Sequence, residues 1–372
     1  MRTDPERNDI GELEKRHQIE SFVKGRFNVE DMMTRDDGYV EYKISESSSL
    51  KQNFADLVRE LRQYSHTATL RRVGEDVLLY TGRSPAHRPF NRRIPLVLFL
   101  ATLTTVTIDG VFRVTALPQG GSIPLIFFYT MGLMGILGVH ELGHKIASSH
   151  HGIKSSYPYF IPGLPGFLPT FGAVIKSGEP PANRDSLFDL GISGPIAGLA
   201  VTLLVAVGGA FTSVSLSSQE ISRRIGEGSV RELVQTDIFT NYILGLIAPQ
   251  AEGMGLLLSP LSFAASLGFL VTFLNLLPAW QLDGGHIARA AVSSRVHRAL
   301  TWATIIVMIL LGFALMALLV LFMSFRAPAM QPLDDVSPLS RKRRIAFVLT
   351  LVLAAGLYYF TIMNNPFFFP SV

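Results

Sequence analysis

Long blocks of apolar, uncharged residues after residue 93 constrain this chain more than any other feature of its sequence. A helix that spans a bilayer needs about 20 mostly apolar residues. Six blocks reach that length, some after small extensions: 94–114, 123–148, 188–212, 259–282, 299–325 and 345–364. The first is the weakest, because Asp109 interrupts it. We therefore expect an all-α, multi-pass membrane protein with about six transmembrane helices, whose environment is the lipid bilayer.

The first 93 residues instead have the composition of a soluble protein. Residues 1–34 are polar and are expected to form a tail or short helices. A strand-like stretch, an amphipathic helix and a hairpin then predict a small soluble α/β domain at 35–90, followed by a transmembrane domain at 91–372. Ser49 and Gln52 have capping-box spacing at the start of the helix. A spacer or regulatory role is favoured for this domain over a second active site.

Two further segments do not fit regular spanning helices. Residues 155–175 carry no charge but contain four prolines and three glycines, which a regular helix does not tolerate. Irregular backbone at membrane depth must be buried in protein or line a wet cavity, so a re-entrant loop or hairpin is expected. The apolar run 238–248 is too short to span and is interpreted as interfacial or re-entrant.

Basic residues near the span ends predict the orientation of the chain. They favour a cytoplasmic N-terminus, but six spans then place the run Arg341-Lys342-Arg343-Arg344 on the opposite side. Either this loop is an exception or the helix count is wrong by one near 238–248. A net charge of +4, with lysines and arginines flanking apolar blocks, suits topology signals better than a nucleic-acid surface, so no nucleic-acid partner is expected.

The motif His140-Glu141-Leu142-Gly143-His144 continues a 17-residue uncharged run that begins at Ile123. Residues four apart share one face of a helix, so the two imidazoles can converge on a zinc ion, with Glu141 near enough to act as a base. Ionisable groups at membrane depth are functional by default. The alternative is a solvated helix end just beyond the bilayer.

A catalytic zinc needs a third protein ligand and an open position. The chain has no cysteine, which excludes thiolate ligands and disulfides. Residues 253–282 are uncharged, and the run ends at Asp283, followed by Gly284 and Gly285. From spacing alone, Asp283 is equally well a ligand or a helix-terminal aspartate at the interface.

Two motifs in this order resemble the site-2 protease family of intramembrane zinc metalloproteases, in its compact archaeal and plastid-like form. They are His140-Glu141-Leu142-Gly143-His144 and the stretch from Asn275 to Gly284, which matches the family's N-x-x-P-x-x-x-L-D-G pattern. Ser193-Gly194-Pro195-Ile196-Ala197-Gly198 resembles its small-residue segment. The resemblance implies a zinc site of His140, His144 and Asp283, with Glu141 as catalytic base. It also implies a three-helix catalytic core within 123–290.

The resemblance further implies hydrolysis of peptide bonds within or near transmembrane segments of membrane protein substrates, in regulated proteolysis. Asn275 is a candidate substrate-binding residue, although an interhelical hydrogen bond explains it equally well. Phe171, Gly172 and Ala173 are candidates because an edge strand there would pair with an unwound substrate. His150 and His151 lie too far along the helix to join the site. His286, three residues from Asp283, is a weak alternative ligand, and a neighbouring or solvent-facing role is favoured for it.

Two rival functions are a membrane metal transporter and a catalytically silent homologue. Transporters often carry polar residues in several spans and internal repeats, whereas here the polar groups gather at one locus and no repeat is visible. The proposed catalytic residues are all intact, which argues against a silent homologue. The sequence predicts neither the substrate's identity nor an oligomeric state.

Overall fold

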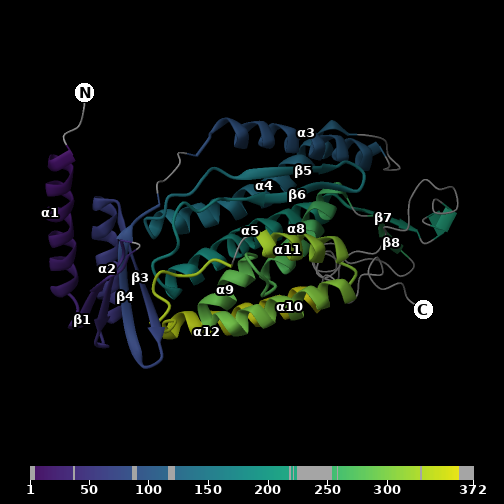
Figure 1. Ribbon diagram of the computed structural model, residues 1–372. Helices are drawn as coiled ribbons and strands as arrows, with labels where there is room; N and C mark the ends of the chain where they lie inside the picture. The colour runs from purple at the N-terminus through teal and green to yellow at the C-terminus, as the bar shows by residue number, and fades with distance from the viewer. Residues whose placement is uncertain are drawn as a thin grey trace.

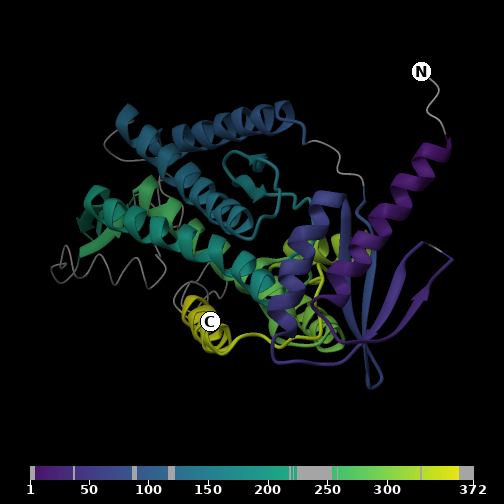
Figure 2. The ribbon, with the colours of Figure 1, turned by 90° about the vertical axis from the view of Figure 1, so that its left-hand side faces the viewer.

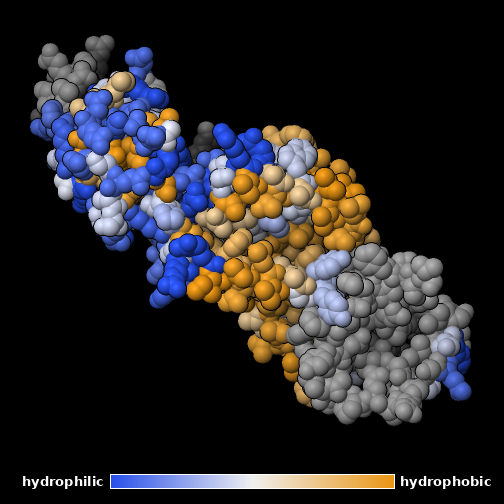
Figure 3. Space-filling model, turned by 90° about the horizontal axis from the view of Figure 1, so that it is seen from below, coloured by the Kyte–Doolittle hydropathy of each residue, from blue (hydrophilic) through white to orange (hydrophobic). Residues whose placement is uncertain are grey.

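The computed structural model describes residues 5–36, 38–85, 90–115, 122–217, 219–220, 222–223, 254–257, 259–326 and 329–359. The apolar run 238–248 and the end of the expected span 345–364 lie outside these residues. A small mixed domain occupies one end of the molecule, and a set of long helices extends away from it (Figure 1). On the face drawn in Figure 3, the small domain is mostly polar and the described helical part is mostly apolar.

The N-terminal domain is built on an antiparallel sheet in the order β1-β2-β4-β3. The hairpin expected around Gly74 is present, and the amphipathic helix buries Leu50, Phe54 and Leu57 against the sheet. Its elements are α1 (Pro5–Lys24), β1 (Val29–Thr34), β2 (Val40–Ile44), α2 (Leu50–Leu61), a 3-10 turn (Arg62–Tyr64), β3 (His66–Val73) and β4 (Asp76–Arg83).

Part of the expected polar tail belongs to this domain. Ile19, Val23 and Phe27 are buried in the domain core, and β1 pairs with β2. The polar appearance of this region has a simple cause, since β1 is an edge strand whose side chains are mostly exposed. The expected cap at Ser49 is also different: α2 begins after Ser49, but its side chain makes no capping hydrogen bond.

Three of the described helices are long and apolar enough to cross a membrane: α3 (Arg93–Thr115), α4 (Ile123–His150) and α5 (Arg184–Thr212). Helix α5 packs against α4 on one side and α8 (Pro260–Leu276) on another. The expected block 259–282 is helical only to Leu276, because Pro278 holds Leu277 in an extended conformation. The remaining helices are α9 (Asp283–Ala291), α10 (Ser294–Leu310), α11 (Ala314–Arg326) and α12 (Arg341–Tyr358).

The expected single span 299–325 is wrong, because two helices occupy it. Gly312 adopts a left-handed φ of 84° and ends α10, a conformation that glycine takes without steric cost. Helix α11 folds back along α10, so that Ile305 and Met308 pack with Ala317 and Val320 (Figure 1). This reversal returns residues 329–340 to the end of the molecule that holds the N-terminal domain. The expected helix count is therefore wrong at 299–325, and the alternative error near 238–248 lies outside the described residues.

The Pro/Gly-rich segment forms a hairpin, as one of the two expected alternatives. Strands β5 (Tyr159–Leu164) and β6 (Leu168–Val174) pair antiparallel around a turn at Gly166, whose φ is 82°. The hairpin lies against α3 and also touches α4 (Figure 2). A second short pair, β7 (Val214–Ser217) and β8 (Met254–Leu257), lies at the end of α5 far from the N-terminal domain.

Candidate metal centre

Two histidines of α4 and one aspartate of α9 meet in the interior of the helical part. Nε2 of His140 lies 3.1 Å from Oδ2 of Asp283, and Nε2 of His144 lies 3.2 Å from Oδ1 of the same carboxylate. The two Nε2 atoms are 3.2 Å apart. The expected pair and the expected third residue are therefore brought together, although 143 positions separate His140 from Asp283 along the chain.

The turn between α8 and α9 delivers Asp283 to this place. It runs through Pro278 and through Trp280, whose left-handed φ of 43° is rare for a bulky residue. The backbone N–H of Trp280 donates to Oγ1 of Thr301 on α10, at 3.0 Å, which supports that conformation. A Cβ on Gly284 would lie 2.0 Å from the carbonyl oxygen of Leu276, so only glycine allows the turn to close this tightly.

The orientation of His144 is set by a backbone carbonyl of α5. Its Nδ1–H donates to the carbonyl oxygen of Leu190 at 2.7 Å, and a carbonyl can only accept. The proton is thereby held on Nδ1, which leaves the lone pair of Nε2 directed toward His140 and Asp283. Metal-binding histidines are usually fixed by such a hydrogen bond to the other ring nitrogen.

Small residues of α5 allow α4 and α9 to approach so closely. A Cβ on Gly194 would lie 2.1 Å from Nε2 of His144, and one on Gly198 would lie 3.0 Å from the Cβ of His140. A Cβ on Gly191 would lie 2.8 Å from the carbonyl oxygen of Asp283. These glycines serve close packing, as expected for Gly194 and Gly198. Their lack of side chains leaves room for His140, His144 and Asp283 to come together.

Glu141 lies beside the cluster without joining it. Its side chain is 4% exposed, and its Oε2 has no hydrogen-bond partner among the described residues. A buried carboxylate oxygen without a partner is costly. Oε2 of Glu141 is therefore free to accept a proton from a water molecule beside the cluster.

The donor set fits zinc. The three candidate ligand atoms all lie within 4.8 Å of one another. Zinc takes imidazole nitrogen and carboxylate oxygen at about 2.0–2.2 Å in tetrahedral geometry, which implies ligand atoms roughly 3.3 Å apart. The observed separations of 3.1 and 3.2 Å are close to that value. Two imidazoles, one carboxylate and no thiolate match the known donor sets of catalytic zinc.

Asn275 reaches the edge of this cluster. Its Nδ2 lies 3.5 Å from Nε2 of His140, at the limit of a hydrogen bond. The strand candidates lie on β6, where Phe171 is 45% exposed and Gly172 has a left-handed φ of 90°. Ala173 is opposite Phe160 of β5 and packs against the core formed by α3, α4 and α8. Within the described residues β6 pairs with no strand besides β5, although the N–H of Gly172 donates to Oγ1 of Thr170 and the carbonyl of Pro169 accepts from Oγ1 of Thr105.

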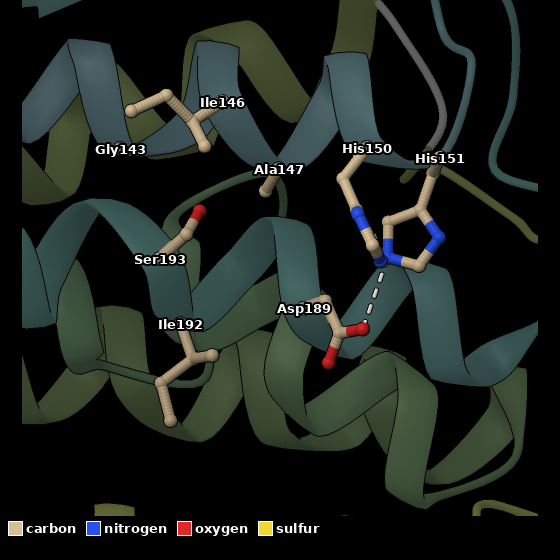
Figure 4. A pocket seen from close by; sticks show the side chains of 8 residues that line it. All are labelled: Gly143, Ile146, Ala147, His150, His151, Asp189, Ile192 and Ser193. Carbon is tan, nitrogen blue, oxygen red and sulfur yellow. Dashed lines mark hydrogen bonds and ion pairs between the residues drawn. The ribbon is translucent and has the colours of Figure 1, made fainter.

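Three other histidines stay outside the cluster, as expected. His150 and His151 line a groove between α4 and α5, where Nε2 of His151 lies 2.9 Å from Oδ2 of Asp189 (Figure 4). Nδ1–H of His286 donates to the carbonyl oxygen of Leu282 at 2.9 Å. His286 thus neighbours the site without contributing a ligand atom to the group.

Asp109 has a role that the sequence does not reveal. Its buried carboxylate accepts from the hydroxyl of Tyr129 on α4 at 2.5 Å and from the backbone N–H of Gly166 at 2.7 Å. Arg113, one turn further along α3, pairs with it at 2.6 Å. Asp109 thus joins α3, α4 and the hairpin turn, whereas in the sequence it only lowers the hydropathy of 94–114. The sequence feature that could have predicted such a role is an acidic residue within an apolar span.

Comparison with known proteins identifies relatives. A family model described as Peptidase family M50 matches residues 128–319, just over half of the chain. The curated protein "Probable zinc metalloprotease EGY2, chloroplastic" of Arabidopsis thaliana is 30% identical over 177 residues, which cover 46% of this chain and 29% of that protein. "Probable zinc metalloprotease EGY3, chloroplastic" of Oryza sativa subsp. indica is 28% identical over 279 residues, or 64% of this chain and 44% of that protein.

A third relative, "Probable zinc metalloprotease EGY1, chloroplastic" of Arabidopsis thaliana, is 29% identical over 235 residues, which cover 60% of this chain and 40% of that protein. The chain thus spans less than half the length of these curated relatives. No solved structure matches. The region matched by the family model contains every residue of the metal-binding group.

Proposed function

Because the chain belongs to peptidase family M50, the family of the site-2 proteases, we propose that it is an intramembrane zinc metalloprotease. Its substrates would be membrane proteins, cut within or near a transmembrane segment in regulated proteolysis. One observation carries this proposal: His140, His144 and Asp283 converge in the helical part, with the buried Glu141 beside them.

In the proposed reaction His140, His144 and Asp283 hold the zinc ion. Zinc bound there supplies Lewis acidity toward a peptide carbonyl and toward water. The chain's own contribution is proton transfer and positioning. Oε2 of Glu141 accepts the proton of the attacking water and then delivers it to the departing amine, since no other described group competes for that oxygen.

A transmembrane substrate must unwind before its carbonyls can be attacked, because its helix hides them in internal hydrogen bonds. Strand β6 pairs with no described strand besides β5, which supports a docking site for the unwound segment along its other edge. An extended peptide can add to an edge strand through main-chain hydrogen bonds that do not depend on its sequence. Phe171, Gly172 and Ala173 would line that strand, and the amide of Asn275 would donate to a substrate carbonyl near His140.

We place the chain in the membrane as a multi-pass protein with its N-terminal domain in the cytoplasm. The α10–α11 reversal supports this orientation, because it returns the run 341–344 to the side of the N-terminal domain. Arg343 contacts Asp185 and Asp189 at the start of α5, on that same side. The basic residues that conflicted with a six-span count then obey the preference for cytoplasmic lysine and arginine.

The test is purification in detergent, followed by zinc analysis and an assay on single-span substrates. Glu141→Gln should keep one zinc per chain and lose at least 100-fold in turnover, in line with the usual contribution of a general base. Glu60→Gln, a partly exposed change in the N-terminal domain, is the matched control and should behave as wild type.

Each rival function predicts a different result in this experiment. A metal transporter would move zinc across vesicles and would continue to do so with Glu141→Gln. A silent homologue would hold zinc without cleaving any substrate offered. Zinc-dependent cleavage by the wild type that persists in Glu141→Gln would contradict the role of Glu141.

A further inference from the structure

A short segment of chain, residues 333–335, contacts both the N-terminal domain and the helical part. Residues 333–335 run beside the outer strand β3, where the N–H of Leu70 donates to the carbonyl of Leu333 at 2.9 Å and the N–H of Asp335 donates to the carbonyl of Leu70 at 3.2 Å. The side chain of Leu333 is buried in the core of the N-terminal domain.

The same segment is bonded on its other side to the start of α5. The N–H of Leu333 donates to the carbonyl of Pro181 at 2.9 Å, and the N–H of Asp334 donates to the carbonyl of Ala182 at 2.8 Å. Asp334 is fully buried, and its Oδ1 accepts from the N–H groups of Val336 and Ser337. The segment is therefore held rigidly between the two parts of the molecule.

An ion pair with a buried guanidinium connects this segment to α9. Nη2 of Arg289 lies 2.6 Å from Oδ2 of Asp335, and the side chain of Arg289 is 1% exposed. Arg184 of α5 pairs with the other oxygen of Asp335 at 3.1 Å. A buried guanidinium is tolerated only when it is paired, so the position of Arg289 depends strongly on Asp335.

Helix α9 carries both Arg289 and the proposed ligand Asp283. The two residues are six positions apart, or about 9 Å along a helix axis at 1.5 Å per residue. The helix is only nine residues long and touches α5 closely at Gly191. A shift of its Arg289 end would therefore be transmitted to Asp283 with little loss.

We propose that Arg289 and Asp335 are positioning residues for Asp283, through which the N-terminal domain sets the geometry of the metal centre. The domain then acts as a support for the site rather than as a spacer. The inference rests on the proposed function, because it takes Asp283 to be a zinc ligand. It assigns to the soluble domain a role in metal affinity.

Other contacts at the same junction provide a matched control. Lys51 of α2 pairs with Asp185 of α5 at 2.7 Å and donates to the carbonyl of Pro338 at 3.0 Å. These contacts join the domain to α5 and to the 329–340 segment without touching α9. Loss of Lys51 therefore loosens the junction but leaves the Arg289–Asp335 link in place.

The experiment compares the full chain in detergent with Arg289→Gln, Asp335→Asn, the double variant and Lys51→Gln, measuring zinc affinity by competition with a chelator. We expect each single variant to bind zinc about tenfold more weakly or worse, as for other residues that orient metal ligands. The double variant should be no weaker than the worse single one, and Lys51→Gln should match wild type. Saturating zinc should restore cleavage by Asp335→Asn, which a folding defect would not allow.

If the wild-type chain binds zinc, and Asp335→Asn and Arg289→Gln both bind it with the same affinity as the wild type, this inference is overturned while the proposed function stands. An equal loss of affinity in Lys51→Gln would also overturn it, since the effect would then belong to the junction in general. Arg289→Lys, which keeps the cation, guards against misfolding of Arg289→Gln and should retain more affinity. A wild-type chain that binds no zinc would overturn the proposed function, and this inference with it.

Discussion

A Cβ atom on Gly194 would lie 2.1 Å from Nε2 of His144, the atom that faces Asp283. Gly194→Ala should therefore displace the imidazole and lower zinc affinity by tenfold or more, as measured by chelator competition. Gly138→Ala on α4 is the matched control, because a Cβ there meets nothing within 4 Å. Alanine is also the better helix former, so this control should fold at least as well as wild type. Unchanged zinc binding in Gly194→Ala would contradict the observed packing.

Asp109 should matter for stability rather than for zinc. Asp109→Ala leaves Arg113 without its buried partner and frees the N–H of Gly166 at the hairpin turn. We expect a loss of about 3–5 kcal/mol, the usual cost of breaking a buried pair, seen as a lower thermal midpoint and faster proteolysis near residue 166. Asp76→Ala removes an ion pair at an exposed site and is the control. Equal midpoints for the two variants would show that the Asp109 network contributes nothing.

Docking of substrate on β6 predicts a backbone effect. Prolines introduced singly at Phe171, Ala173 and Ile175 each remove an N–H donor, so at least one should abolish turnover while zinc content stays at the wild-type level. Phe171→Ala keeps the N–H and should retain most activity if main-chain bonding provides the affinity. Full turnover in all three proline variants would exclude strand addition at this edge.

The reversal between α10 and α11 predicts where the 329–340 segment is accessible. Because the natural chain has no cysteine, single cysteines can be introduced without removing others. Cysteines at the exposed positions Arg59 and Gln331 should react with an impermeant maleimide from the same side of a vesicle, and one at Ser217 from the opposite side. Labelling of position 331 together with position 217 would restore a single span at 299–325.

The local features of the site follow from the sequence because they depend on helix periodicity. His140 and His144 share a face by their spacing alone, and the apolar run before them places them at membrane depth. Asp283 is different, because spacing alone fits a helix-terminal aspartate as well as a zinc ligand. The family resemblance was needed to identify it as a ligand. Its position depends on a turn at Pro278 and Trp280 that no periodicity encodes.

Other features depend on tertiary contacts that hydropathy does not report. The helical hairpin at Gly312 lies inside a continuous apolar run, so length alone favoured one span over two short helices. Strand β1 lacks the apolar–polar alternation of a half-buried strand, and its side chains are mostly exposed, which hid it in the expected tail. The pairing of Arg289 with Asp335 joins residues 46 positions apart and could not be inferred from either one's neighbours.

Zinc-edge X-ray absorption on the purified wild-type chain is the decisive measurement for this site, because it reports the atoms bound to the metal. We predict one zinc per chain, bound by two imidazole nitrogens and by carboxylate oxygen at about 2.0–2.2 Å. In Asp283→Asn the oxygen contribution should weaken while the two imidazoles remain. A chain that binds no zinc, or a spectrum without imidazole, would contradict the site formed by His140, His144 and Asp283.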